Sequence, residues 1–193
     1  MIAAFAIPLL ALQSTPLADV FDVLKQLAGE EASEPAVQAR PTSCDGAGFA
    51  QFDFWAGEWD VYPTGGDKQV AESHIERLHA GCAIRETWMP FKGQGGSSLS
   101  SYDGATGKWH QTWIGSSPGR VEFEGGSDMP DTMVLTGWWP NAGGPGKDGW
   151  IRMTYSANAD SSVRQLGEAS FDDGKSWQPS FDFTYRSRPE KQD

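Results

Sequence analysis

The chain has 193 residues, which suits one domain with a buried core better than two domains. Its 26 acidic residues outnumber the 15 basic ones, giving a formal charge of −11, and the Lys and Arg residues are scattered singly. No basic cluster could neutralise successive phosphates, so the composition argues against nucleic acid as a partner.

The N-terminal segment has features of an export leader. Residues 1–12 form an apolar run of the length of a signal-peptide core, which is too short to span a bilayer. No Lys or Arg precedes this run and no clean Ala-x-Ala site follows it, so an apolar tail on a cytoplasmic protein is the alternative. We favour a periplasmic or secreted protein with no stable membrane span.

Residues 13–48 divide into a short helix and a linker. Five apolar residues recur there at helical spacing: Leu17, Val20, Phe21, Leu24 and Leu27. This helix either docks on the folded domain or belongs to the leader, and residues 29–48 are rich in Ala, Glu, Pro, Ser and Gly. All nine Trp residues come later. We therefore assign residues 1–48 to leader, helix and linker, and residues 49–193 to the folded domain.

Cys44 and Cys82 are the only cysteines of the chain. Behind an export-like leader they are expected to pair, because a disulfide persists in an oxidising compartment. Such a bridge would stabilise the fold by roughly 4 kcal/mol on the chain-entropy model. Two unrelated thiols are the alternative.

From Gly57 onward the sequence consists of short alternating segments separated by Gly, Pro, Asn and Asp. The connections are short, so neighbouring strands are expected to form antiparallel hairpins. Ten candidate strands result, at residues 58–62, 68–79, 82–91, 96–103, 108–115, 119–126, 131–139, 149–156, 162–170 and 178–187.

Hairpin-linked strands in one small domain leave two unpaired edges unless the sheet closes. The sequence therefore predicts an all-β fold, a single antiparallel up-and-down β-barrel of about ten strands. A β-sandwich is the rival. A barrel of this size is wide enough to leave an internal cavity.

Two motifs carry a resemblance to a known fold. Residues 52–60 read Phe-Asp-Phe-Trp-Ala-Gly-Glu-Trp-Asp, and residues 81–88 read Gly-Cys-Ala-Ile-Arg-Glu-Thr-Trp. The first resembles the opening of calycin and lipocalin barrels, where a helical turn leads into a strand carrying Gly-x-Trp. Together they resemble a group of small bacterial domains of unknown function, over residues 49–187.

The resemblance implies a fold and assigns no chemistry. It implies that Trp59, two residues after Gly57, plugs the closed end of the barrel, with Trp55 as a further core aromatic. It also implies that an arginine near the last strand, Arg186 or Arg188, packs across Trp59. Haem-binding barrels of the nitrobindin kind share Gly-x-Trp but supply a late histidine, and no His follows His110 here, so haem is not expected.

Residues 170–177 read Ser-Phe-Asp-Asp-Gly-Lys-Ser-Trp, which matches the Asp-box hairpin of sialidase propellers. In such a hairpin Asp172 and Gly174 shape the turn, and Trp177 packs beneath it. One copy in so short a chain predicts a structural hairpin and does not indicate a sialidase.

Strand alternation indicates a candidate site, because residues two apart share a face. If the Trp side chains face inward, Glu86 and Gln111 are polar groups inside the barrel, and Arg152 meets Glu86 or Glu168 there. The alternative places these charges on the outer face, in solvent. Six residues are candidates to bind a ligand: Glu86, Trp88, Trp109, Gln111, Trp113 and Arg152.

We expect the barrel to bind a small, largely apolar molecule, and the sequence names no protein partner. The alternative is an acid/base enzyme, an isomerase or hydrolase, in which Glu86 or Glu168 carries the proton and Arg152 is the charge partner. No motif of nucleophilic catalysis or nucleotide binding is present. The three histidines do not match a metal-ligand spacing, so we expect no metal and no cofactor.

Overall fold

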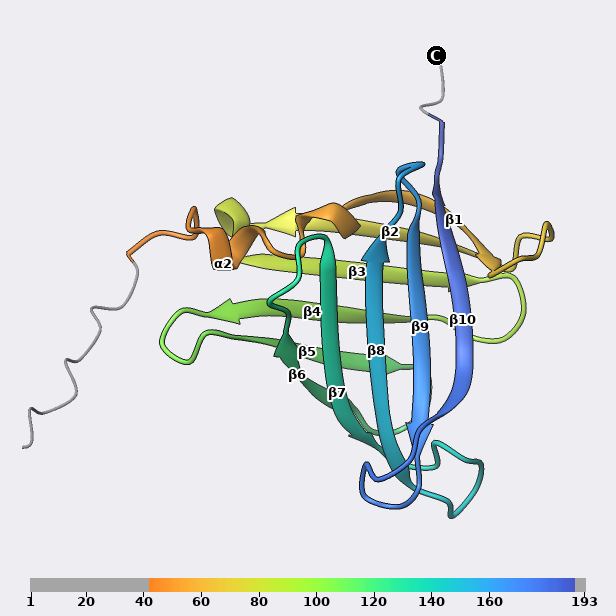
Figure 1. Cartoon of the computed structure of the whole chain (residues 1–193). Helices are drawn as coiled ribbons and strands as arrows, with labels where there is room; N and C mark the ends of the chain where they lie inside the picture. The colour runs from red at the N-terminus through yellow and green to blue at the C-terminus, as the bar shows by residue number, and fades with distance from the viewer. Residues whose placement is uncertain (1–41, 190–193) are drawn as a thin grey trace, which may run out of the picture. The chain divides into compact units, whose positions relative to one another are not determined.

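The computed structural model describes residues 42–189, which form a β-barrel with short helices at one end (Figure 1). The helices are α2 (Ala47–Ala50), η1 (Asp53–Trp55) and η2 (His79–Gly81). The strands are β1 (Gly57–Pro63), β2 (Ala71–Leu78), β3 (Ala83–Pro90), β4 (Gly96–Asp103), β5 (Lys108–Gly115), β6 (Val121–Gly126), β7 (Thr132–Trp139), β8 (Gly149–Ala157), β9 (Val163–Ser170) and β10 (Gln178–Ser187).

The sheet closes into a barrel of ten strands, each antiparallel to its neighbours in sequence. Closure is made by β1 and β10, which pair over Trp59–Ser187 to Pro63–Phe183. In Figure 1, β3, β4 and β5 run across the view, whereas β8, β9 and β10 run up it, so the two walls cross. The predicted all-β up-and-down barrel is confirmed and is consistent with a calycin-like fold. The β-sandwich alternative is wrong.

The expected leader and helix lie outside the described residues, as does the expected linker up to residue 41. The expected domain boundary at residue 49 therefore stays a prediction. Within residues 42–189, no helix has the length and apolar character needed to cross a membrane.

Most strands alternate between a buried and a more exposed face, as expected for a sheet with one side against a core. In β8, Ile151, Met153 and Tyr155 are buried, while Arg152 and Thr154 between them are partly exposed. The buried apolar residues form one core cluster inside the barrel.

Aromatic residues fill one end of the barrel, which we call the closed end. The ring of Phe52 stacks on that of Trp55 with centroids 4.8 Å apart, and Trp55 lies 4.8 Å from Tyr155. Trp59 is buried beside them and donates its indole N–H to the Trp55 carbonyl at 2.9 Å. Gly57 has φ +150°, and a Cβ there would lie 3.3 Å from the Trp59 ring, so glycine is required.

Neither arginine near the last strand packs across Trp59, so that expectation is wrong. The register pairs Trp59 with Ser187, which places Arg186 and Arg188 on the opposite, outer face. Arg188 donates to Asp60 at 2.8 Å, and Arg186 lies 4.2 Å from the centre of the Tyr62 ring.

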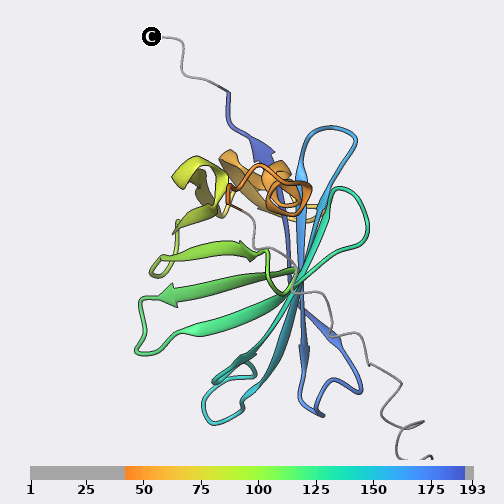
Figure 2. The same ribbon diagram turned by 90° about the vertical axis from the view of Figure 1, so that its left-hand side faces the viewer.

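Cys44 and Cys82 lie at disulfide distance, with their Cα atoms 5.0 Å apart. The bridge joins the segment that leads into α2 to the η2 connection between β2 and β3. Figure 2 shows the short helices gathered at this one end of the barrel. A disulfide at this place fits a protein that folds in an oxidising compartment.

The Asp-box hairpin connects β9 to β10 at the opposite end of the barrel. Asp172 accepts hydrogen bonds from the Ser170 hydroxyl at 2.8 Å and from the Ser176 backbone N–H at 2.9 Å. The hydrogen bond from the Ser176 hydroxyl, together with these two, lowers the pKa of Asp172 to about 2. Trp177 donates its indole N–H to the Gly174 carbonyl at 3.1 Å, which anchors the indole to the turn.

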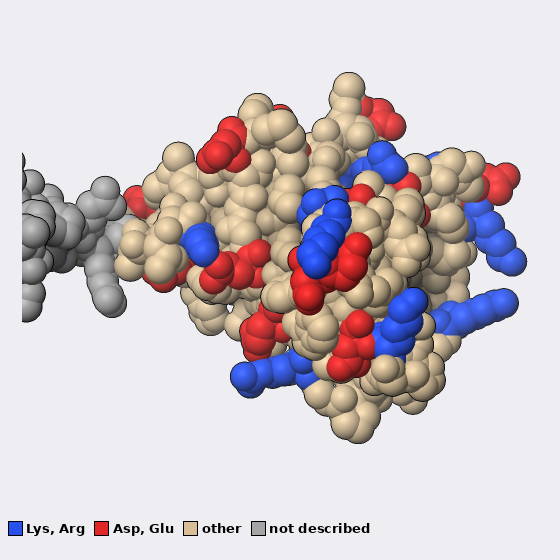
Figure 3. Space-filling view, turned by 60° about the horizontal axis from the view of Figure 1, so that its bottom comes forward, with Lys and Arg blue, Asp and Glu red and all other residues tan. Residues whose placement is uncertain are grey.

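Charged side chains on the outer face are arranged in pairs. Arg164 bonds Asp182 at 2.6 Å, and Arg85 bonds Glu76 at 2.5 Å. On the face shown in Figure 3, acidic and basic side chains lie next to one another and do not form a patch of one sign.

Candidate functional site

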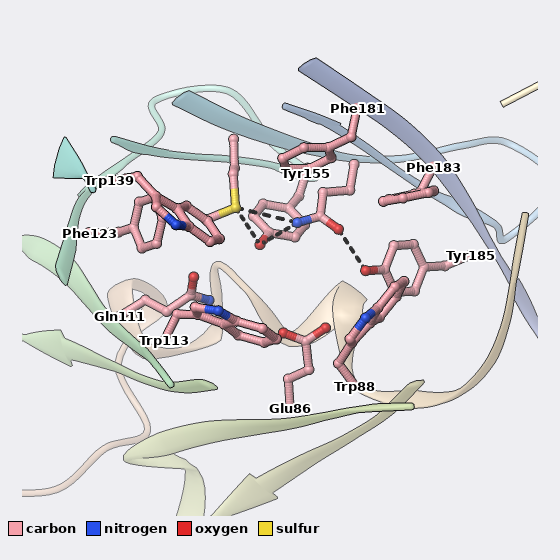
Figure 4. A pocket seen from close by; sticks show the side chains of 12 residues that line it. Glu86, Trp88, Gln111, Trp113, Phe123, Trp139, Tyr155, Phe181, Phe183 and Tyr185 are labelled. Carbon is pink, nitrogen blue, oxygen red and sulfur yellow. Dashed lines mark hydrogen bonds between the residues drawn. The ribbon is translucent and has the colours of Figure 1, made fainter. Parts of the chain in front are cut away.

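The barrel encloses a cavity of about 300 Å³ on the open side of the closed-end core. Its walls come from seven strands, β3 and β5 to β10. Figure 4 shows the side chains converging on this space. Twelve residues line it: Glu86, Trp88, Gln111, Trp113, Phe123, Trp139, Met153, Tyr155, Gln165, Phe181, Phe183 and Tyr185.

Strand alternation sorts the interior into layers along the barrel. On β5, Trp109 lies in the closed-end core, Gln111 follows two residues later, and Trp113 comes last toward the open end. On β3 the inward residues follow the same order, from buried Ile84 through Glu86 to Trp88. A polar middle layer therefore lies between an aromatic core and an aromatic mouth.

Glu86 is the ionisable group at the centre of this polar layer, with only 5% of its surface exposed. The Ser73 hydroxyl donates to its Oε1 at 3.3 Å, and the Ser98 hydroxyl donates to its Oε2 at 3.1 Å. Burial raises the pKa of Glu86 to about 7, while the two serine hydrogen bonds act in the opposite direction. The carboxyl can therefore gain or lose a proton near neutral pH.

A second polar group faces Glu86 from the opposite wall. Tyr185 donates its hydroxyl to Gln165 Oε1 at 2.6 Å, and Gln165 Nε2 donates to the Tyr155 hydroxyl at 3.0 Å (Figure 4). Burial, with the Glu86 carboxyl nearby, raises the pKa of both tyrosines well above the usual value. Both phenols therefore stay neutral and serve as hydrogen-bonding groups.

The open end of the cavity is bordered by Trp113 and Trp139. These two indoles also line a surface hollow formed by residues 115–121 and 139–145. They consequently separate the inner cavity from the surface. The connections that form this hollow are those that follow β5 and β7.

Four of the six residues predicted to bind a ligand line the cavity: Glu86, Trp88, Gln111 and Trp113. Trp109 does not, contrary to expectation. It lies one step deeper, in the closed-end core, where its indole N–H donates to the Gly48 carbonyl at 3.1 Å. It faces inward but is covered by other side chains.

Arg152 and Glu168 lie on the outer face, so the interior location expected for them is wrong. Arg152 donates to Glu168 Oε2 at 2.8 Å and stacks over the Trp177 ring at 4.3 Å. The expectation depended on inward-facing Trp side chains, and Trp150 shares the face of Arg152 because it lies two residues before it. Its ring instead packs outside against Trp138, with centroids 5.5 Å apart, so the inward face of β8 belongs to its odd-numbered residues.

Several lining residues were missed by the sequence analysis although their pattern was readable. On β10, Phe181, Phe183 and Tyr185 place an aromatic ring at every second position, and all three line the cavity. On β8, Met153 and Tyr155 alternate in the same way. Gln165 offered no comparable signal, since a single glutamine in a strand fits either face.

No protein-family model matches the chain, and no curated protein is significantly similar to it. Within the part of the chain that the structure describes, no three His, Cys, Asp or Glu side chains are grouped so that they could hold a metal ion. The function therefore has to be argued from the cavity and its lining residues.

Proposed function

We propose that the protein binds a small, largely apolar molecule inside a lipocalin-like barrel. The observation that carries the proposal is the cavity of about 300 Å³, whose lining is mostly aromatic and whose polar groups are few and converge on one layer. Binding pockets in proteins have this composition, and their volumes start at about 300 Å³. The ligand is accordingly small.

The direction of binding follows from the layers. An apolar body is favoured among Trp88, Trp113 and Phe183 near the open end, where burial removes apolar surface from water. The polar end of the ligand is favoured at Glu86 and Gln111, because a buried polar group of the ligand needs hydrogen-bond partners and these side chains can supply them. We propose that Glu86 and Gln111 orient the ligand and that the indoles hold it.

The proposed location is the periplasm or the outside of the cell. Two observations support it: the apolar leader-like run at residues 1–12 and the pairing of Cys44 with Cys82.

A fluorescence titration with the neutral dye N-phenyl-1-naphthylamine tests the binding proposal. Dye fluorescence should rise on binding, and Trp113→Ala should weaken binding about tenfold because an aromatic wall is lost. Trp138→Ala is the matched control, since this indole is 45% exposed on the outer face. Absence of dye binding, or equal weakening by both variants, would contradict the proposal.

The acid/base alternative rests on the burial of Glu86, which raises the pKa of its carboxyl to about 7. Among the lining residues Glu86 is the only carboxyl, so the pair of interior carboxylates is not available. Glu86→Gln separates the two functions. Weaker uptake of the natural ligand with an intact fold supports binding, whereas normal uptake with lost turnover supports catalysis.

A further inference from the structure

The cavity contains one acidic side chain and no basic one. Of the twelve lining residues, only Glu86 and the two tyrosines are titratable, and none is Lys, Arg or His. Among all buried residues in the described part of the chain, Glu86 is likewise the only Asp, Glu, Lys or Arg. Among the side chains that the structure describes around the cavity, none can therefore neutralise a negative ligand, while Glu86 can neutralise a positive one.

The Glu86 carboxyl is held in place without being paired to a cation. Ser98 on β4 and Ser73 on β2 donate to its two oxygens at 3.1 and 3.3 Å. The titratable groups that face it from the other wall are Tyr155 on β8 and Tyr185 on β10, both neutral. A buried carboxylate without a counter-charge is costly, so a cation entering the cavity would gain a strong partner.

Aromatic rings surround the same carboxyl. Trp88 follows Glu86 by two residues on β3 and therefore shares its face; its ring lies 5.6 Å from Phe183 and 6.3 Å from Tyr185. Figure 4 shows the carboxyl reaching into the space between Trp88 and Trp113. Faces of indole and phenol rings attract organic cations, most strongly where water is excluded.

We infer that the ligand class of this cavity is a small amphipathic amine, with its ammonium group bonded to Glu86 and its apolar part among the rings toward the open end. This inference rests on the proposed binding function and names the ligand for it. A fatty acid or another carboxylate is disfavoured, because its negative charge would be buried beside Glu86 with no cationic partner. A neutral alcohol can form a hydrogen bond with Glu86 but has no positive charge to pair with the carboxylate.

Three probes with the same body and different heads test the inference: phenylbutylamine, phenylbutanol and phenylbutyrate. Each displaces N-phenyl-1-naphthylamine in competition at neutral pH. The amine should bind about tenfold more tightly than the alcohol, the usual gain of a charge-assisted hydrogen bond, and the carboxylate should bind least.

Glu86→Gln should remove the preference for the amine and leave binding of the alcohol nearly unchanged. Glu168→Gln is the matched control, because it removes the same charge from the outer face. Proton release gives an independent readout: at about pH 6 the amine should displace the proton of Glu86, so calorimetry in buffers of different ionisation enthalpy should show release for the amine alone.

Two failures can be told apart. If the dye and all three probes fail to bind, the proposed binding function is wrong. If the dye binds but the alcohol or the carboxylate competes as well as the amine, or if Glu86→Gln keeps the amine preference, the cavity binds ligands and the inference about amines is overturned.

Discussion

Glu86 couples protonation to folding. Its carboxyl is buried with two serine hydroxyls and no cation, and its pKa rises to about 7 from an ordinary value of 4.5. In the unfolded chain this carboxyl ionises near pH 4.5, whereas in the folded chain it ionises near pH 7. The stability that the protonated group contributes is therefore complete below about pH 4.5 and is lost as pH rises to about 7.

Glu86→Gln should remove this pH dependence. Relative to the wild type, the variant's free energy of unfolding should increase between pH 4.5 and pH 7 by up to about 3 kcal/mol. Urea denaturation of both proteins across this range measures the difference, in which the contributions of other carboxylates cancel. Parallel stability curves would show that Glu86 titrates normally in the folded state.

The inward location of Glu86 could be predicted from its strand because Ile84 and Trp88 flank it two residues away on each side. The outward location of Arg152 could not be predicted from its strand. The two residues before it, Trp150 and Ile151, are adjacent and both apolar, so either could point inward. Trp150 packs on the outer face against a partner from another strand, Trp138, and single-strand patterns do not report such pairs.

At the scale of elements, the strand β1 and the turn before it form one unit that seals the barrel. Phe52, Trp55 and Trp59 come from a stretch of eight residues and are all buried together. The resemblance to calycin barrels implied a plug at Trp59, and the structure adds the hydrogen bond from the Trp59 indole N–H to the Trp55 carbonyl.

Trp59→Ala should destabilise the protein by about 3–5 kcal/mol, as deletions of large buried aromatics do. Trp138→Ala, at an exposed position, should cost far less. Denaturant midpoints of the two variants, compared at a constant m-value, measure the loss in free energy of unfolding. An equal shift for both would mean that Trp59 does not anchor the closed end.

At the scale of the molecule, barrel closure was predictable because strands joined by short hairpins leave edges that only closure removes. The set of residues that line the cavity was less predictable. Depth along the barrel decides whether an inward residue joins the core, as Trp109 does, or lines the cavity, as Trp113 does. Depth depends on the stagger of all the strands, which no single strand encodes.

The pairing of Cys44 with Cys82 should matter for global stability. The two residues are 38 apart in sequence, so the bridge should contribute about 4 kcal/mol on the chain-entropy model. Denaturation of the oxidised protein against the Cys44→Ser, Cys82→Ser double variant measures the contribution. Two freely alkylatable thiols in protein taken from its native compartment would contradict the pairing.

For the proposed ligand, the sealed end would also govern the kinetics of exchange. With aromatic side chains filling one end and Trp113 and Trp139 bordering the other, a guest molecule has to leave by the path through which it came. A change that only narrows this passage would slow arrival and departure by the same factor and leave the equilibrium untouched. Release would then be timed by motion of two indoles, independently of how tightly the interior holds its guest.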